Sequence, residues 1–246
     1  MSETPATRSV YLLVHAHPDD ETLATAAVLV VLRAQGRPGY VLTATRGEQG
    51  EVVAGTLDRY PSGTTLTAVR EAELAAATAV LGVQGHAYLG QPPARAAGRQ
   101  PRIYQDSGMR WVTPTQAGPS GDAGPQALTS APPEEVAADI AAYAAAVGAT
   151  DLVSYDADGG YGHPDHVLLH QATAVVADRL GLRFWVIESE PGEAVEWYDA
   201  AAYRSTVAAA HRAYATQFTV DGDTITHVGG QQQPVVVATG LRQVRR

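Results

Sequence analysis

The sequence predicts an α/β fold, a Rossmann-like, mostly parallel sheet with helices on both faces and a small C-terminal cap. Short β-favouring apolar runs alternate with Ala-rich helical segments, the order typical of a parallel sheet covered by helices. Two polar clusters directly follow predicted strands, where open α/β sheets bind ligands. The 246 residues are enough for one large domain with its own core.

The first half of the chain predicts three strands and two helices in alternation. Residues 10–14 (VYLLV) form an apolar run typical of a strand buried on both faces. Residues 22–34, rich in Ala, Leu and Val, predict a helix, and residues 40–45 predict a second strand. The strongest helical pattern covers residues 66–81 and is followed by a glycine stop. Residues 86–89 predict the third strand.

The middle of the chain starts with a long segment without periodicity. Residues 90–133 are rich in Gly, Pro, Gln and Ser, so we expect a functional or partly disordered loop. A helix opens at Pro133, where proline and two acids suit a helix N-terminus. Strands are expected at residues 151–155 and 183–188, separated by a helix over residues 165–180.

The pattern changes after residue 190. A helix is expected around residues 200–214, and Asp-Gly between β-favouring residues predicts a hairpin within residues 218–226. We therefore predict a catalytic domain over residues 1–190 and an α/β cap over residues 191–246, packed on the same domain.

Composition excludes several classes of function. The chain has no Cys, which excludes disulfides and thiolate metal ligands, and its basic residues are all Arg, which excludes a catalytic lysine. A net charge of −9 without basic runs argues against nucleic-acid binding. The polar N-terminus and the lack of a long apolar span predict a cytoplasmic protein without membrane contact. The sequence does not indicate an oligomeric state.

Two clusters of acids and histidines carry the chemistry. The first is residues 14–21 (VHAHPDDE), and the second is residues 159–166 (GGYGHPDH). Carboxylates rarely gather at the rim of an apolar core unless a cation pairs with them. Because both clusters follow predicted strands, we expect them to meet at the same edge of the sheet and to hold a divalent metal.

The residue types in the two clusters indicate which side chains bind the metal and which transfer protons. His17 and Asp20 can reach one cation from the first turn, and His166 can supply a third ligand. Two His and one carboxylate suit Zn²⁺ or Fe²⁺, one ion per chain. Asp19 is then free to act as general base, and His163 can donate a proton or stabilise an oxyanion.

Several of these residues also have a purely structural interpretation. The acids at residues 19–21 could simply cap a helix, but that does not explain His17 or the second cluster. Residues 70–73 could be a solvated helix face, and residues 104–109 an ordinary turn. Four further histidines are expected to be structural: His15, His86, His170 and His227.

The motifs resemble those of a known family. HPDDE (17–21), TRGEQG (45–50) and GYGHPDH (160–166) look like the PIG-L (LmbE-like) de-N-acetylases. These are metal-dependent enzymes that remove acetyl groups from N-acetylglucosamine-type sugars. YQDSGM (104–109), the segment 155–166 and AYATQ (213–217) resemble the mycothiol branch of that family. This branch holds the N-acetylglucosaminyl-inositol deacetylase and the mycothiol-conjugate amidase.

The resemblance implies the same metal ligands and the same general base as the residues themselves. It further implies that His163 stabilises the tetrahedral intermediate and assists amine departure, and that Asp165 orients and tunes His163. Tyr161 matches a mobile tyrosine at the reacting centre. Arg70 and Asp106 match residues that grip the substrate, and we expect them at the rim of the site.

The leading expectation is therefore a deacetylase acting on N-acetylglucosaminyl-inositol, a small polar sugar substrate. Two enzymatic alternatives stay open: an amidase acting on mycothiol S-conjugates, and a deacetylase of another amino-sugar conjugate in secondary metabolism. A sugar-binding module without catalysis is a third. The retained acid, histidines and ligand set argue against it.

Overall fold

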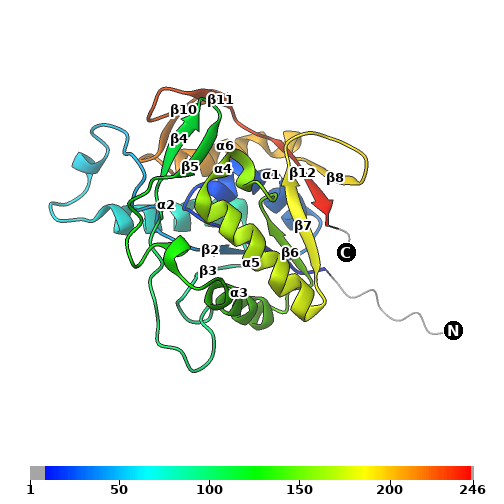
Figure 1. The fold of residues 1–246 in the computed structure, drawn as a ribbon. Coiled ribbons are helices and arrows are strands. Elements are labelled where there is room, and N and C mark those ends of the chain that lie inside the picture. The colour runs from blue at the N-terminus through cyan, green and yellow to red at the C-terminus, as the bar shows by residue number, and fades with distance from the viewer. Residues whose placement is uncertain (1–8, 245–246) are drawn as a thin grey trace.

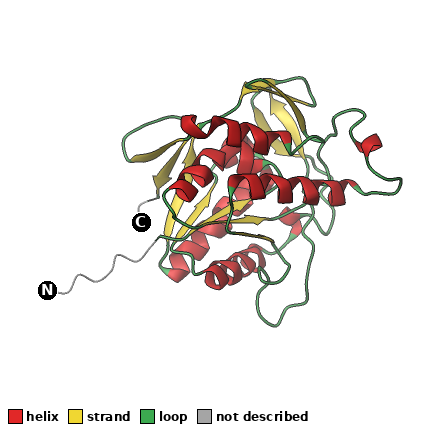
Figure 2. Cartoon of the chain, turned by 180° about the vertical axis from the view of Figure 1, so that it is seen from behind, coloured by secondary structure: helices red, strands yellow, loops and turns green. Residues whose placement is uncertain are grey.

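The computed structural model describes residues 9–244 and centres on a seven-stranded sheet with helices on both faces (Figures 1 and 2). The first five strands in spatial order pair in parallel, and the last two pair antiparallel. The predicted fold class is confirmed. The strands in spatial order are β3 (Gly85–Tyr88), β2 (Gly39–Thr43), β1 (Tyr11–His15), β6 (Asp151–Ser154), β7 (Arg183–Glu188), β12 (Ala238–Gln243) and β8 (Val195–Asp199).

Strand β1 lies between β2 and β6, and each of its five residues is buried. Alternate side chains enter different halves of the core, as the two-residue period of a strand requires. Leu12 and Val14 pack in one apolar cluster, whereas Tyr11 and Leu13 pack in the other. This central position explains why the sequence of β1 is apolar without interruption.

Helices cover the two clusters. Helices α1 (Asp20–Ala34), α2 (Leu66–Leu81) and α6 (Arg204–Arg212) bury side chains in the cluster of Leu13, while α3 (Pro133–Val147) and α5 (Pro164–Leu180) do so in the cluster of Leu12. A single turn, α4 (Gly159–Gly162), precedes α5. Short 3-10 helices lie at Leu57–Arg59, Leu128–Ser130 and Ala201–Tyr203. Within residues 9–244 no helix has the length and apolar character needed to cross a membrane.

Residues 90–133, expected to be a functional or partly disordered loop, are mostly loop but also contain a hairpin that the sequence did not predict. Strands β4 (Met109–Thr113) and β5 (Gln116–Pro119) form an antiparallel hairpin there. Four of the five β4 residues are exposed, so the strand leaves no alternating apolar pattern to find. The first part of the segment is fixed by Arg95, which pairs with Glu135 at 2.8 Å and Asp139 at 2.7 Å on α3.

The segment after residue 190 forms a small separate sheet and adds two strands to the main sheet. Strands β9 (Phe218–Asp221), β10 (Thr224–His227) and β11 (Gln232–Pro234) form a small separate sheet, which includes the predicted hairpin. Strands β8 and β12, which the sequence analysis did not predict, extend the main sheet. The division at residue 190 stays a prediction, and its outermost residues, 1–8 and 245–246, lie outside the described part of the chain.

Candidate metal and catalytic site

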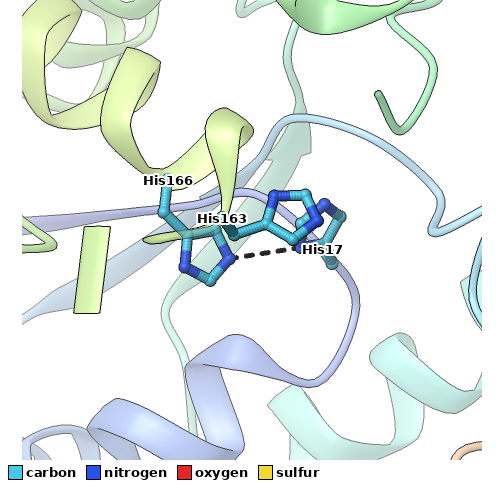
Figure 3. A group of neighbouring side chains, drawn as sticks. All are labelled: His17, His163 and His166. Atoms are coloured by element: carbon cyan, nitrogen blue, oxygen red, sulfur yellow. Dashed lines mark hydrogen bonds between the residues drawn. The ribbon is translucent and has the colours of Figure 1, made fainter. Parts of the chain in front are cut away.

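The two acid and histidine clusters meet at the carboxyl ends of the neighbouring strands β1 and β6. The Nδ1 atom of His17 lies 3.4 Å from a carboxylate oxygen of Asp20, and Nε2 of His166 lies 3.4 Å from the same oxygen. The two ring nitrogens are 3.3 Å apart, the contact that the dashed line in Figure 3 marks. A tetrahedral ion with bonds of about 2.0–2.2 Å separates its ligands by about 3.4 Å. The triangle therefore fits one such ion.

Both histidines can present a lone pair to that point. Nδ1 of His166 lies 3.2 Å from the Gly159 carbonyl, which only accepts hydrogen bonds, so this nitrogen carries the proton and Nε2 is free. Nε2 of His17 lies 3.3 Å from the Asp165 carboxylate and 3.5 Å from Asp106, which leaves Nδ1 free. Partners of this kind fix the tautomer of metal-binding histidines.

Tyr155 positions two members of the triad, and the sequence analysis did not assign it this role. Its hydroxyl donates to the Asp20 carboxylate at 2.7 Å and accepts from the Ala16 N–H at 2.7 Å. Its ring stacks on the His166 ring with centres 3.8 Å apart and an interplanar angle of 6°. Its sequence signals are its place directly after β6 and its position at the start of the segment 155–166, which resembles the mycothiol branch.

The electrostatics of the site favour positive charge at the triad. Burial alone would lower the pKa of His17. The carboxylates of Asp106, Asp165 and Asp20 outweigh burial and raise it well above the usual range, which favours a second proton on the ring, at Nδ1. A cation bound at Nδ1 would take the place of that proton. Burial likewise opposes ionisation of Asp20, but His166 and His17 hold the pKa of this carboxyl well below its usual range. A site that stabilises one cationic group among ionised carboxylates has the charge distribution of a metal centre.

Asp19 lies beside the triad in a strained turn. It is a non-glycine residue with φ of 119°, a backbone conformation rare for such residues and common at functional sites. Its carboxylate accepts no hydrogen bond from the described residues, while burial and the charges of Asp20 and Glu21 raise its pKa well above the usual value. A free carboxylate with a raised pKa suits a proton acceptor.

His163 is a hydrogen-bond donor rather than a ligand. Its Nδ1 accepts the Asp165 backbone N–H at 3.2 Å, so the neutral ring carries its proton on Nε2. Burial and the neighbours His17 and His166 lower the pKa of His163 to about 3, which keeps it neutral. Among residues 9–244, two other groups have ligand atoms within 4.8 Å of one another: His17 with His163 and His166, and His17 with Asp106, His163 and Asp165. Because both need His163, the triad with Asp20 fits a metal better.

Asp165 contacts His163 through its backbone and His17 through its side chain. Its carboxylate accepts from the Ser107 N–H at 3.0 Å and from the Ser107 hydroxyl at 2.5 Å, and it lies 3.3 Å from Nε2 of His17. Only its backbone N–H contacts His163, which caps the N-terminus of α5. Asp165 therefore orients His163 through its amide and His17 through its carboxylate, and the charge of that carboxylate raises the pKa of His163 against the larger effect of burial. The role of Asp165 in orienting and tuning His163 during the reaction stays a prediction.

The two residues expected at the rim lie deeper than predicted. Arg70 is 1% exposed, and its guanidinium donates to the carbonyls of Gly47 and, at 2.9 Å, Glu51. Those carbonyls belong to the turn after β2 and need buried donors. Asp106 is 8% exposed and lies 3.9 Å from Nε2 of His163. Both residues therefore form the inner wall of the site.

Tyr161, expected at the reacting centre, lies beside His166 and is partly open to solvent. It comes from α4, is 40% exposed, and its ring centre is 5.3 Å from that of His166. Burial of the hydroxyl and the nearby Asp20 raise the pKa of Tyr161, so the phenol stays protonated and can donate a hydrogen bond.

The four histidines expected to be structural lie outside these groups of ligand atoms. His15 and His86 pair with threonine hydroxyls at 3.0 Å each, and His170 pairs with the Tyr155 carbonyl at 2.8 Å. His227 packs near Phe218 in the small sheet. Each has a local packing role.

The sequence model of the PIG-L family, described as GlcNAc-PI de-N-acetylase, matches residues 12–177. A protein of Kineococcus radiotolerans is 43% identical over 162 residues, covering 66% of this chain and 43% of the relative. One of Saccharomonospora viridis is 33% identical over 259 residues, covering 91% of each chain. Both are named 1D-myo-inositol 2-acetamido-2-deoxy-alpha-D-glucopyranoside deacetylase. The chain spans about half the length of the first curated relatives it matches.

Among solved structures, a zinc-inhibited form of teicoplanin deacetylase has a TM-score of 0.58, with 18% identity and 84% coverage of each chain. At this identity the likeness demonstrates a common fold alone. The family match rests on the sequence, and it confirms the resemblance drawn from the three motifs.

Proposed function

The chain belongs to the PIG-L family of de-N-acetylases, and we propose that it is a metal-dependent hydrolase that removes the acetyl group of an N-acetylglucosamine-type sugar. The observation that carries the proposal is the triad of His17, Asp20 and His166 with the free carboxylate of Asp19 beside it. The names of the relatives support N-acetylglucosaminyl-inositol as the substrate.

One divalent ion would be held by His17 Nδ1, an Asp20 oxygen and His166 Nε2. The donor set suits Zn²⁺ and Fe²⁺ equally, so the proposal extends to both. The ion would supply Lewis-acid activation of water and of the amide carbonyl.

Asp19 takes the proton of the attacking water in this scheme. Its carboxylate is free of hydrogen bonds from the described residues, and its raised pKa makes it a better base than an ordinary aspartate. The same carboxyl then passes the proton to the departing amine nitrogen, a step that the family resemblance assigns to His163. In this scheme the neutral His163 acts as a hydrogen-bond donor instead.

His163 and Tyr161 act on the carbonyl oxygen. The Nε2–H of His163 and the Tyr161 hydroxyl can both donate to the oxygen as it gains negative charge. The Asp165 amide holds the His163 tautomer in which Nε2 carries the proton. Collapse of the tetrahedral intermediate then releases acetate and the free amine.

The test compares three substrates with the purified, metal-loaded protein. Release of free amine is measured with N-acetylglucosaminyl-inositol, an S-conjugate of mycothiol, and N-acetylglucosamine. The highest kcat/KM on the first supports the proposal. A preference for the S-conjugate assigns the protein to the amidases, and turnover of none of them with metal bound refutes the assignment of this substrate class.

A further inference from the structure

An exposed aromatic side chain lies next to the opening of the site. Trp111 on strand β4 is 52% exposed, and its ring centre lies 5.8 Å from that of Tyr161 with an interplanar angle of 35°. Tyr161 in turn lies 5.3 Å from His166. Trp111 of the β4–β5 hairpin and Tyr161 of the adjacent helix α4 therefore form an aromatic surface that runs from solvent to the proposed metal ligands (Figure 1).

The hairpin is tied to the site on both sides. At its base, Ser120 donates to the Ser107 carbonyl at 3.2 Å, and Ser107 holds the Asp165 carboxylate. On its other side, strand β5 packs on the backbone of α4: a Cβ added at Gly162 would lie 2.7 Å from the Ala117 carbonyl oxygen. These contacts fix the position of Trp111 relative to the catalytic groups.

Arg70 and Asp106, the polar residues expected to grip the substrate, are poorly placed to reach a ring outside the site. Arg70 is 1% exposed and bonded to backbone carbonyls, and Asp106 lies against His17 and His163. The exposed Trp111 face offers a different kind of recognition. Aromatic faces stack on the apolar C–H faces of sugar and cyclitol rings, which are polar only at their edges.

We propose that Trp111, together with Tyr161, forms the wall that stacks on the second ring of the substrate, the group joined to the N-acetylglucosamine unit. This proposal rests on the proposed function and deepens it. The substrate class it names is a two-ring conjugate with an apolar ring face. A free monosaccharide reaches the ligands and Tyr161 but leaves Trp111 without a partner.

The experiment compares Trp111→Ala and Trp111→Phe with Val112→Ala, the matched control from the same strand, which changes a side chain that is 62% exposed. Trp111→Ala should lower kcat/KM for N-acetylglucosaminyl-inositol about tenfold, mainly through KM, and change that for N-acetylglucosamine less than about twofold. Trp111→Phe should restore most of the loss, and Val112→Ala should resemble the wild type. Equal losses on both substrates, or no loss on either, overturn the proposal.

A binding measurement separates failure of this proposal from failure of the proposed function. If the wild-type protein turns over neither compound, the proposed function fails, and tryptophan fluorescence during titration with N-acetylglucosaminyl-inositol decides the role of Trp111. Quenching in the wild type that is lost in Trp111→Phe supports the stacking wall. Titration curves that match in the two proteins overturn it.

Discussion

Removing the hydroxyl of Tyr155 should weaken metal binding without removing a ligand. The Tyr155→Phe variant keeps the ring that stacks on His166 at 3.8 Å. It loses the hydrogen bond to Asp20 and leaves the Ala16 N–H without its partner, both at 2.7 Å in the wild type. Asp20 retains one other hydrogen bond, from the His17 N–H at 2.8 Å.

The magnitude follows from these contacts. A hydrogen bond to a charged group contributes about 1.5–3 kcal/mol, and an unpaired buried N–H costs about 1–3 kcal/mol. Because relaxation of the surrounding structure recovers part of the combined loss, we expect the free energy of unfolding to fall by about 2–4 kcal/mol. Loss of a group that orients a metal ligand typically lowers metal affinity about 10–100-fold.

Metal affinity is measured by competition between the protein and a chelator of known affinity, for Zn²⁺ and Fe²⁺ separately. The free energy of unfolding is measured by denaturant unfolding of the metal-free protein. Tyr143→Phe, which changes a buried tyrosine of α3 in the same apolar cluster, is the control and should leave metal affinity unchanged. Wild-type metal affinity in Tyr155→Phe, even with lowered stability, refutes the positioning role.

Three further outcomes follow from the site and the core. Asp19→Asn should lower kcat about 10²–10⁴-fold at unchanged metal content, measured by elemental analysis and steady-state kinetics; loss of the metal would contradict its role as base. His163→Ala should lower kcat about 10²–10³-fold and also keep the metal, because Nε2 is a donor; an empty site in this variant would make His163 a ligand. Burial opposes ionisation of Asp151, but hydrogen bonds from Arg183 and neighbouring residues hold the pKa of this carboxyl below its usual range. The ionised carboxylate therefore stabilises the fold above the unfolded pKa, near 4, and this stabilisation is lost as the pH falls through the folded pKa. Asp151→Asn should therefore lower the free energy of unfolding by about 1–2 kcal/mol at pH 7, a value reduced because Arg183 is half-exposed. The difference between variant and wild type should shrink below about pH 4. If urea unfolding gives the same difference from pH 7 to pH 3, this ion pair is not its cause.

Patterns within a short stretch of sequence predicted the helices and strands whose ends are set by nearby residues. Helix α2 has the predicted bounds, residues 66–81, because its periodicity ends at a glycine in the left-handed conformation. Strands β8 and β12 escaped prediction because they complete an edge of the sheet formed by distant strands. Strand β8 carries two exposed polar residues, so its sequence contains no buried apolar run.

The site was predictable in its composition but not in its internal contacts. His17, Asp20 and His166 come together because both clusters follow strands that are neighbours in the sheet, where Leu13 pairs with Val153. Which carboxylate faces which histidine depends on tertiary geometry. The contact of Asp165 with Ser107, 58 residues away, has no local sequence signal, and the same holds for the bond from Tyr155 to Asp20.

The most direct test of the account is a crystal structure of the metal-loaded protein with anomalous scattering recorded at the metal edge. The account predicts one peak per chain, about 2.0–2.2 Å from His17 Nδ1, one Asp20 oxygen and His166 Nε2, with the Asp19 carboxylate close by but not bound. A peak on Nε2 of His17 together with Asp106, His163 and Asp165 would contradict the assignment of ligands, donor and base.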